Sequence, residues 1–461
     1  MPDSAPLTAR PPATLTVCIP THDGRAPMLA EAIESVLAQC TPALAGRVEL
    51  AIADNASRDG TPDVIAAARE RGVPIAYRRH PENLGVSRNV QASVALARTG
   101  WCWLLSSDDA LEPAAIARVL ALVEAHPDVV GATVGQTVFD ASLTRLAPTQ
   151  AAAMPALDRT TVLRDPDAIV GELGWGMSGL SSQIVRRDAW ERAAARVLAE
   201  PGAGDFVFPH VAVMLAMTTA APAWLWCPDR LVRVRADNLS IVPGGRWEAR
   251  LMRELDAHWG TTVGRGPGRA RARRRVLDAF RERSTFAAVR GTPGSGVGDD
   301  VAMLRAFVPI HGGRPSAWPA LAPLLVPRPL LGAAAGPPLD PLAAADRHVA
   351  VRVALPGTLR PAQERMLACT IANRGSATLT STGPHPVSVA ARWTHAQDGE
   401  THDGLRAVLT RPLRPGRSRA LHCSVVAPLR EGTWELRVGA LQEHVAWFEQ
   451  GTAVGRVEVR R

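Results

Sequence analysis

Two adjacent carboxylates, Asp108 and Asp109, follow a short apolar run that begins at Trp101. After Pro113 the chain enters a helical pattern. Because Asp is common at the start of a helix, one interpretation is a helix cap with a second acid beside it. The alternative is a cation site, because Mg²⁺ and Mn²⁺ prefer carboxylate oxygens and commonly join one or two protein acids to a diphosphate. In this second interpretation the ion offsets the repulsion between the two acids and neutralises charge on the diphosphate.

Polar residues also follow two earlier apolar runs. Thr21 and Asp23 follow the first run, and Asp54 and Asn55 follow the second. Such residues favour turns, which is the plainer interpretation. In a parallel sheet, however, ligands bind at the carboxyl ends of the strands, and an acid there can accept a hydrogen bond from a nucleobase or a ribose hydroxyl. We therefore expect all three groups to converge on one site.

Strand and helix patterns alternate from residue 13 to about residue 138. The pattern predicts strands at 13–19, 48–53, 73–78 and 101–105, and helices at 26–39, 61–71 and 86–98. This alternation is typical of an α/β fold with a Rossmann-like, mostly parallel sheet and helices on both faces. From 139 to 262 the pattern is less regular, with a glycine-rich loop, a strand and a helix expected over 174–193 and a basic strand followed by a turn over 231–240.

The sequence changes character after residue 262. Arginines cluster over 264–283 at the start of a helical pattern, and Pro/Gly-rich linkers are expected at 291–300 and 326–341. The cluster is either a solvated helix start or a contact to anionic lipid headgroups or phosphates. Short alternating runs with Pro/Gly turns then predict an antiparallel β-sandwich. We expect three parts: a first domain at 12–262, a helical and linker region at 263–346, and an accessory β-sandwich at 347–461.

The composition limits the classes of partner and compartment. All 52 basic residues are Arg, and the net charge is +8. That skew, with abundant Ala, indicates mutational bias, so we do not take the charge as evidence for nucleic acid, although it suits an anionic membrane surface. The 6 cysteines show neither CxxC spacing nor a metal-like cluster, which predicts reduced thiols in a cytosolic protein. Neither a secretory signal nor a transmembrane helix is expected.

Four stretches together resemble family 2 glycosyltransferases of the GT-A fold in order and approximate spacing. They are CIPTHDGRAPMLAEAIESVLAQ, IADNASRDGT, HPENLGVSRNVQASVALA and LLSSDDALEP, and they lie within residues 13–135. The resemblance implies an enzyme that moves a sugar from a nucleotide-diphosphate donor to a hydroxyl of a glycan or lipid-linked acceptor, assisted by Mg²⁺ or Mn²⁺. The C-terminal run resembles the closing strands of small immunoglobulin-like sandwiches appended to polysaccharide-assembly enzymes.

The resemblance also assigns roles to individual residues. Thr21 and Asp54 match positions that contact the nucleoside, with Asp23 and Asn55 beside them, and Arg88 matches the arginine that reaches the nucleotide. Asp108 matches the metal ligand of the DxD motif, with Asp109 next to it. The chain departs from the family where the first acid of that motif falls on Ser106, and where Asp23 stands in place of a common Asn. A serine binds a cation less strongly, so metal-independent nucleotide binding stays open.

Inverting transfer needs a carboxylate base that deprotonates the acceptor hydroxyl. The resemblance places it at Asp205, with Glu200 as the weaker candidate, although Asp205 also suits a cap of the helix that contains His210. His210 itself is expected to be packed or hydrogen-bonded rather than catalytic.

Three further residues of the second half are candidates for contacts to the donor or the acceptor. Arg233 or Arg235 is expected either to approach the diphosphate or to face solvent. Trp175, in the glycine-rich loop, is either a sugar-stacking face or a packed aromatic.

These observations predict a cytoplasmic enzyme, in solution or peripheral at the inner face of the membrane, that builds a bacterial surface polysaccharide. Two other classes stay open. A non-catalytic glycan-binding or scaffolding protein on a degenerate transferase fold would explain Ser106 and the added sandwich. Nucleic-acid binding through 264–283 would show a steep salt dependence, and we do not expect it.

Overall fold

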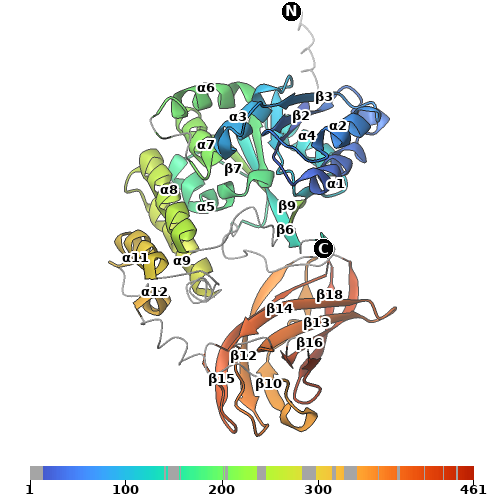
Figure 1. Ribbon diagram of the computed structural model, residues 1–461, viewed down its shortest axis with the longest axis vertical. Helices are drawn as coiled ribbons and strands as arrows, with labels where there is room; N and C mark the ends of the chain where they lie inside the picture. The colour runs from blue at the N-terminus through green and yellow to red at the C-terminus, as the bar shows by residue number, and fades with distance from the viewer. Residues whose placement is uncertain are drawn as a thin grey trace, which may run out of the picture. The chain divides into compact units, whose positions relative to one another are not determined.

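The computed structural model describes most of the chain in two compact units (Figure 1). The described residues are 14–139, 142–143, 155, 157–200, 202, 206–235, 245–282, 297–313, 318–325, 340–361, 363–381, 385–409, 411–428, 430–442 and 445–460. The first unit comprises Met1–Gln136, Ala152–Val234 and Arg250–Val276, and the second comprises Thr137–Ala151, Arg235–Ala249 and Leu277–Arg461. The predicted base Asp205 and most of both predicted linkers lie outside the described residues.

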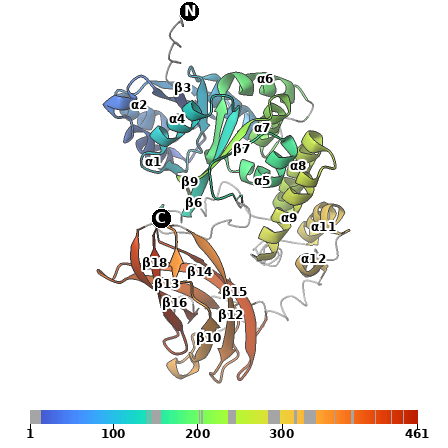
Figure 2. The ribbon, with the colours of Figure 1, turned by 180° about the vertical axis from the view of Figure 1, so that it is seen from behind.

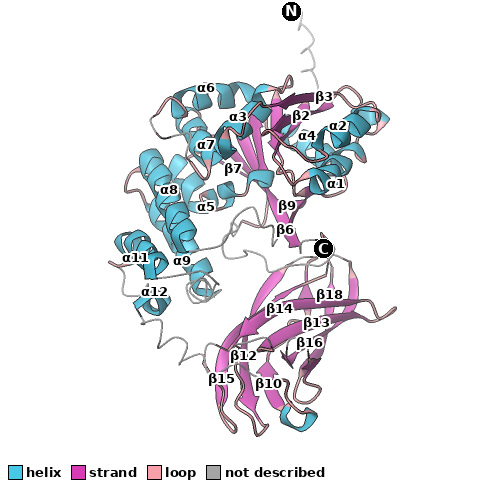
Figure 3. Cartoon of the chain, viewed as in Figure 1, coloured by secondary structure: helices cyan, strands magenta, loops and turns pink. Residues whose placement is uncertain are grey.

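A mixed sheet forms the centre of the first unit (Figure 3). Among the described residues its strands run in the order β3-β2-β1-β4-β8-β6-β9-β5, and β7 pairs with β9. The strands are β1 (Leu15–Thr21), β2 (Val48–Asp54), β3 (Ile75–Arg79), β4 (Trp101–Leu104), β5 (Ala110–Leu111), β6 (Gly131–Phe139), β7 (Thr161–Leu163), β8 (Gln183–Arg186) and β9 (Trp224–Arg235). Strands β1 to β4 pair in parallel, whereas β4–β8, β6–β8, β5–β9 and β7–β9 are antiparallel.

Helices cover both faces of this sheet (Figure 2). They are α1 (Ala26–Leu37), α2 (Thr61–Arg69), α3 (Gly85–Ala95), α4 (Ala115–Ala125), α5 (Pro166–Leu173), α6 (Arg187–Val197) and α7 (Pro209–Ala220). Alternate strand residues such as Val17, Ile52 and Trp103 share one core with α1, α2 and α4. Because successive side chains of a strand point to opposite faces, the intervening residues face the other layer, where α3 packs against β1 and β2.

The arginine cluster packs a helix onto the first unit. Helix α8 (Gly245–Val263) is followed by α9 (Pro267–Glu282), and Asp256 of α8 accepts hydrogen bonds from Arg269 at 2.7 Å and from Arg273 at 2.5 Å. Arg275 pairs with Glu172 of α5. Burial alone would raise the pKa of Asp256, but the two arginines hold it below its ordinary value. Paired arginines of this kind stabilise helix packing, so this part of the cluster is not a free basic surface.

The start of α9 also approaches α5 closely. A Cβ on Gly268 would lie 1.9 Å from the carbonyl oxygen of Asp167, and the Gly268 N–H donates to the Asp167 carboxylate at 2.7 Å. Any side chain at Gly268 would therefore push the helix away. In the second unit, α11 (Val297–His311) contacts α12 (Trp318–Leu325). Within the described residues, no helix combines the length and the apolar character needed to cross a membrane.

The second unit contains two sheets that share one apolar core. Its strands are β10 (Val349–Val353), β11 (Thr358–Leu359), β12 (Glu364–Asn373), β13 (Val387–His395), β14 (Thr401–Val408), β15 (Ser418–Val426), β16 (Gly432–Gln442), β17 (Ala446–Trp447) and β18 (Ala453–Val459). One sheet has the order β10-β12-β15, the other β11-β18-β16-β13-β14 with β17 beside β16. Side chains of both, including Ile371, Trp393 and Trp434, fill the space between them.

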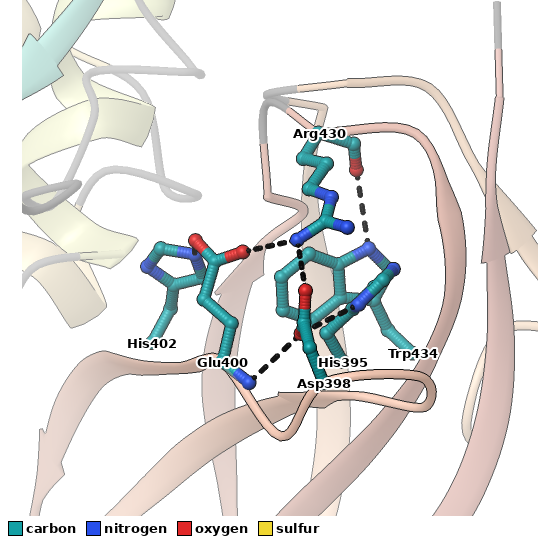
Figure 4. Close-up of polar contacts among 6 residues, drawn as sticks. All are labelled: His395, Asp398, Glu400, His402, Arg430 and Trp434. Atoms are coloured by element: carbon teal, nitrogen blue, oxygen red, sulfur yellow. Dashed lines mark hydrogen bonds and ion pairs between the residues drawn. The ribbon is translucent and has the colours of Figure 1, made fainter.

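An exposed network of charged residues joins two loops of this β-rich unit (Figure 4). Arg430 donates to Asp398 at 2.6 Å and to Glu400 at 2.8 Å. His395 lies 2.8 Å from Asp398, and the Trp434 indole N–H donates to the Arg430 carbonyl at 3.1 Å. The network ties the β13–β14 turn to the residues that precede β16.

The fold class predicted from sequence is confirmed. The strand and helix predictions for residues 13–105 match β1 to β4 and α1 to α3, with ends that differ by a few residues. The expected helices on both faces and the C-terminal sandwich are also present. The sheet is parallel only in its first half, because β8 runs opposite to both of its neighbours, β4 and β6.

Candidate active site

The loop after β1 joins the ends of β2 and β4. Strand β1 lies between them, and Thr21 is in register with Asp54. Asp23, on the loop, accepts hydrogen bonds from the backbone N–H groups of Arg58 at 2.7 Å and Asp59 at 3.1 Å. On the other side of the loop, Arg25 reaches Asp108. The structure therefore brings together the three groups of polar residues that follow the strands.

Asp54 is a fully buried carboxylate at the end of β2. It accepts hydrogen bonds from the Ser57 N–H at 2.9 Å and from the Tyr77 hydroxyl at 2.7 Å, and Arg79 lies 3.9 Å away. Burial and the hydrogen bond to Asp54 raise the pKa of Tyr77 well above its ordinary value. Each carboxylate oxygen has two lone pairs, so Asp54 retains capacity to accept a further hydrogen bond from a ligand.

Buried polar atoms without hydrogen-bond partners in the described structure surround Asp54. They are Thr21 Oγ1, Ser57 Oγ, His80 Nε2 and Asn89 Oδ1. Their residues are linked to Asp54 or Thr21 through hydrogen bonds that involve the backbone: His80 N–H donates to the Asp54 carbonyl at 2.8 Å, and the Asn89 amide donates to the Thr21 carbonyl at 2.9 Å. Because buried polar groups are nearly always paired, this gathering indicates a site for a polar ligand.

Asn55 holds the loop that leads into α3. Its amide donates to Asn83 at 2.7 Å, and its carbonyl oxygen accepts from the Leu84 N–H at 2.7 Å. Ala56 follows it with φ +64°, in the left-handed region that non-glycine residues rarely adopt. Such conformations concentrate at functional sites. Asn55 thus positions the first turn of α3, where the exposed Arg88 lies.

Asp108 is buried and held from two sides. Ser106 donates from its hydroxyl to Asp108 Oδ1, and Arg25 Nη1 lies 3.2 Å from Asp108 Oδ2. The side chains of Arg25 and Asp108 are 7% and 6% exposed. Ser106, at the position where the sequence comparison expects another acid, therefore orients Asp108 through a hydrogen bond. The helix-cap interpretation fails for Asp108 and Asp109, because the residue that precedes α4 is Ala114.

Ser181 of the glycine-rich loop connects that loop to Asp109. Its hydroxyl donates to Asp109 at 2.5 Å and accepts from the Ser106 N–H at 2.9 Å. The Trp103 indole N–H donates to the Ser181 carbonyl at 2.8 Å. The half-buried Trp175 precedes these residues. The glycine-rich loop is therefore fixed against the carboxylates that follow β4.

The basic strand β9 runs beside the same carboxylates. Ala110 pairs with Arg233, and Arg233 Nε lies 4.0 Å from Glu112. Burial raises the pKa of Glu112, against the opposing effect of Arg233. The structure thus pairs Arg233 with Glu112, while Arg235 is buried at the end of β9.

His210, on α7, is buried as expected from the sequence. Its Nε2 lies 3.1 Å from the Ser178 carbonyl oxygen, which only accepts, so Nε2 carries the proton. Burial lowers the pKa of His210 to about 4. The imidazole is therefore neutral near pH 7 and holds the glycine-rich loop.

Glu254 of α8 holds the segment that leads into α7. Its carboxylate accepts from the N–H groups of Val207 at 2.9 Å and Phe208 at 2.7 Å. Burial would raise the pKa of Glu254, but His258, 3.8 Å away, and the hydrogen bonds from these N–H groups bring it below its ordinary value. An ionised Glu254 therefore fixes the chain just after the position predicted for the base. The weaker candidate Glu200 lies exposed after α6.

The acidic residues of the site do not form an all-protein metal cage. Over the described part of the chain, three or more His, Cys, Asp or Glu residues nowhere gather in an arrangement able to hold a metal ion. A cavity of about 240 Å³ lined by Trp101, Arg186 and Arg187 lies at the start of β4. Asp108 follows the other end of that strand, so this cavity is separate from the converging residues.

Similar proteins are found both by structure and by sequence. The structure of S. aureus TarS is similar with a TM-score of 0.48 and 11% identity, over 97% of this chain and 77% of that one. A mannosyltransferase from Pyrobaculum calidifontis, in complex with GDP-Man and Mn²⁺, has a TM-score of 0.43 and 14% identity, over 69% of this chain and 86% of that one. In sequence, the model of glycosyl transferase family 2 matches residues 16–165.

A curated relative gives a longer match in sequence. The chain is 30% identical over 247 residues to the abequosyltransferase RfbV of Salmonella typhimurium (strain LT2), which covers 50% of this chain and 69% of that protein. The chain therefore belongs to glycosyl transferase family 2, whose members transfer sugars from nucleotide-sugar donors.

The interpretation of the sequence missed three residues that build the site. Arg25, Tyr77 and Ser181 contact Asp108, Asp54 and Asp109 directly. Arg25 lies in the motif THDGR and Ser181 in the glycine-rich loop, so both stand in stretches already singled out. Nothing local in the sequence marks their partners, because each contact depends on how distant segments meet.

Proposed function

We propose that the chain is an inverting glycosyltransferase that moves a hexosyl or deoxyhexosyl group from a nucleoside diphosphate to a hydroxyl of a glycan or lipid-linked acceptor. The observation that carries this proposal is the loop after β1, which contacts the turn after buried Asp54 through Asp23 and reaches buried Asp108 through Arg25. A nucleotide sugar carries a polar nucleoside at one end and a charged diphosphate at the other. The two ends of the loop offer chemistry suited to each.

The nucleoside end is assigned to Thr21 and Asp54. The unpartnered oxygen of Thr21 and the remaining lone pairs of Asp54 suit ribose hydroxyls and base N–H groups. Asp23 and Asn55 position the surrounding loops, as their backbone contacts support. We assign the exposed Arg88, near the start of α3, to a contact with the nucleotide. Arg235 remains the candidate for a contact to the diphosphate.

The diphosphate end fits Mg²⁺ or Mn²⁺ bound through one carboxylate. Asp108 is oriented by Ser106 and lies beside Asp109, and such ions commonly take one or two protein carboxylates and complete their shell with phosphates and water. When bound, the ion would supply positive charge that stabilises the leaving diphosphate. Ser181 keeps Asp109 fixed while Asp108 serves as the ligand.

Transfer requires a base at the acceptor hydroxyl, and Asp205 remains the prediction for this role. The Asp205 carboxylate would take the hydroxyl proton while the acceptor oxygen bonds to the anomeric carbon and the bond to the nucleoside diphosphate breaks. Glu254 supports the role indirectly, because it fixes residues 207–208 beside this position. Neutral His210 keeps the glycine-rich loop in place, with Trp175 as a candidate face for the acceptor sugar.

We infer that the chain acts in bacterial surface polysaccharide synthesis at the cytoplasmic face of the membrane. The name of the Salmonella relative, an abequosyltransferase, supports the transfer of a sugar. We assign the C-terminal sandwich to positioning a glycan or a partner. In the described part of α9, the arginines that pair with Asp256 and Glu172 are not the source of any membrane contact.

A thermal-shift screen of nucleoside diphosphates and nucleotide sugars, with and without Mn²⁺, tests the proposal. A ligand that binds only the folded protein raises its melting temperature. We expect one nucleotide to give a Mn²⁺-dependent shift that Asp108→Asn removes. Asp128→Asn is the matched control, because Asp128 is an exposed acid of the same unit that pairs with Arg164.

Two results would separate this function from its alternative. Release of free sugar or transfer to an acceptor, dependent on the nucleotide found in the screen, supports the transferase. The absence of any shift at millimolar nucleotide, combined with binding to a polysaccharide, would instead identify a non-catalytic glycan-binding protein on this fold.

A further inference from the structure

Arg25 is a buried arginine whose partner is the predicted metal ligand. Its Nη1 lies 3.2 Å from Asp108 Oδ2 and also 3.2 Å from the sulfur of Met28, and its Nε donates to His22 Nε2 at 3.4 Å. We propose that Arg25 is the counter-ion of Asp108 in the donor-free enzyme, and that a divalent cation and the donor diphosphate replace this ion pair together. The inference rests on the proposed function for the identity of the diphosphate.

The charges at the end of β4 show why the two ligands would bind together. The Arg25 guanidinium pairs with Asp108, and the neighbouring Asp109 accepts a hydrogen bond from Ser181. A divalent cation that approaches Asp108 alone meets the positive charge of Arg25 at short range in a buried setting, where such repulsion is strong. The Asp108 carboxylate therefore binds the ion weakly while Arg25 remains paired with it.

A diphosphate changes this balance. An arginine guanidinium binds phosphate oxygens through paired, charge-assisted hydrogen bonds. Once a diphosphate lies nearby, Arg25 gains an anionic partner and Asp108 becomes available to the cation. Each ligand therefore removes an obstacle to the other, which defines positive coupling between the metal ion and the nucleotide.

The backbone on both sides of Arg25 is fixed, so its side chain is the element that changes partner. The Asp23 carboxylate holds the N–H groups of Arg58 and Asp59, and the Ala26 N–H donates to Asp59 at 3.2 Å. Helix α1 begins at Ala26. Arg25 therefore stands between two anchored points, and a long flexible side chain there can change its partner without movement of the loop.

The test measures Mn²⁺ binding to the full chain without any nucleotide. Electron paramagnetic resonance of free Mn²⁺ gives the dissociation constant for the wild type, Arg25→Met, Arg25→Lys and the double variant Arg25→Met with Asp108→Asn. We expect Arg25→Met to bind Mn²⁺ at least about tenfold more tightly than the wild type, a change of about 1.4 kcal/mol. Arg25→Lys, which keeps the charge, should bind as the wild type does, and the double variant should lose the gain.

Folded Arg25→Met that binds Mn²⁺ no more tightly than the wild type would overturn the inference. If Arg25→Met does not fold, Arg25→Gln replaces it, because an amide keeps a hydrogen-bond donor for Asp108 without the charge. Circular dichroism checks the fold of each variant. The measurement needs no donor, so its failure is distinct from a failure of the nucleotide screen, which would count against the proposed function.

Discussion

One arginine–aspartate ion pair from each unit can be compared. The pair with the shorter N···O distance is the more exposed of the two. Arg430 and Asp398 lie 2.6 Å apart in the β-rich unit, with both side chains 47% exposed. Arg25 and Asp108 lie 3.2 Å apart in the first unit, with side chains 7% and 6% exposed. Exposed pairs contribute little because water competes for each charge, whereas loss of one partner from a buried pair leaves an uncompensated charge. Burial, rather than the N···O distance, therefore decides which of the two ion pairs costs more stability when one partner is lost.

The charged residues around the two ion pairs also differ. Asp398 and Arg430 share their charges with His395 and Glu400, so the network of Figure 4 keeps partners when one member is removed. Asp108 is instead followed by Asp109, a second acid in a buried setting. The exposed network suits the fastening of two loops. The buried pair suits a site whose charges are rearranged by a ligand.

The largest difference is expected in sugar transfer. Asp108→Asn removes the proposed ligand of the cation and should lower kcat/KM by about 100-fold or more, as loss of a preorganised charge at a transition state does. Asp398→Asn, the equivalent change in the exposed network, should leave transfer unchanged. Steady-state kinetics with the donor found in the nucleotide screen measures both. Equal activity of Asp108→Asn and the wild type would show that Asp108 has no part in transfer.

The next difference concerns stability. Arg25→Met leaves Asp108 buried without this cation and should destabilise the first unit by about 3 kcal/mol. Arg430→Met should leave the β-rich unit close to its wild-type stability, because the acids it releases are exposed to water. Urea unfolding followed by hydrogen exchange of peptides from β1 and β16 reports on each unit separately. If the Arg430 variant were the less stable, the ranking by burial would be wrong.

Acid should also act differently on the two units. Burial lowers the pKa of His210 to about 4, against about 6.5 in an unfolded chain. Between these values the unfolded state binds a proton that the folded state does not, so stability present above about pH 6.5 falls as the pH drops toward 4. The full effect is about 3 kcal/mol as an upper value, because each pKa unit corresponds to about 1.4 kcal/mol.

In the exposed network, the pKa of Asp398 is shifted downward, as is usual for a paired acid. The hydrogen bond from Arg430 is the main cause that holds the pKa of Asp398 below its ordinary range, and the Glu400 N–H and His395 add smaller effects. The contribution of Asp398 to folding stability is present above about pH 4. It is lost only as the pH falls further, through the lowered pKa. The protection factors from hydrogen exchange should therefore fall in α7 between pH 7 and 4, and not in the β13–β14 turn. His210→Gln should remove most of the pH dependence of hydrogen-exchange protection in α7. If that pH dependence is unchanged, another group causes it.

The smallest expected effect is at the nucleoside end. Tyr77→Phe removes the hydroxyl that donates to Asp54 and should weaken nucleotide binding by about fivefold, or about 1 kcal/mol. Thr433→Val is the control, because it removes a hydroxyl that donates to Glu458 at 2.7 Å on the surface of the β-rich unit. Calorimetry with the nucleotide from the screen compares the two. A larger loss in the Thr433 variant would contradict the placement of the nucleoside.

The positions of the carboxylates could be predicted from sequence because they depend on local patterns. Asp54 and Asp108 each follow a short buried run, and parallel strands place their ends at one edge. The same reasoning identified the glycine-rich loop and the strand after it. The reversed direction of β8 was not visible, because direction within a sheet depends on pairing between distant segments.

The partners of those carboxylates could not be predicted. Arg25 and Asp108 are 83 positions apart, and Ser181 and Asp109 are 72 apart. The arginines of α9 resembled a surface patch because Asp256 and Glu172, the acids that pair with them, lie on other helices. Sequence patterns report which residues are polar and where strands end. Pairing between side chains becomes visible only when the helices are placed in space.

The hydrogen bond between Tyr77 and Asp54 provides a spectroscopic handle on the nucleoside end. The chain contains 1 tyrosine, and its hydroxyl lies 2.7 Å from the carboxylate proposed to receive the nucleoside. Growth on fluorotyrosine would therefore place a single ¹⁹F nucleus in the whole molecule, beside that carboxylate. Its resonance would report nucleoside occupancy directly, without assignment of any other signal and without sugar turnover.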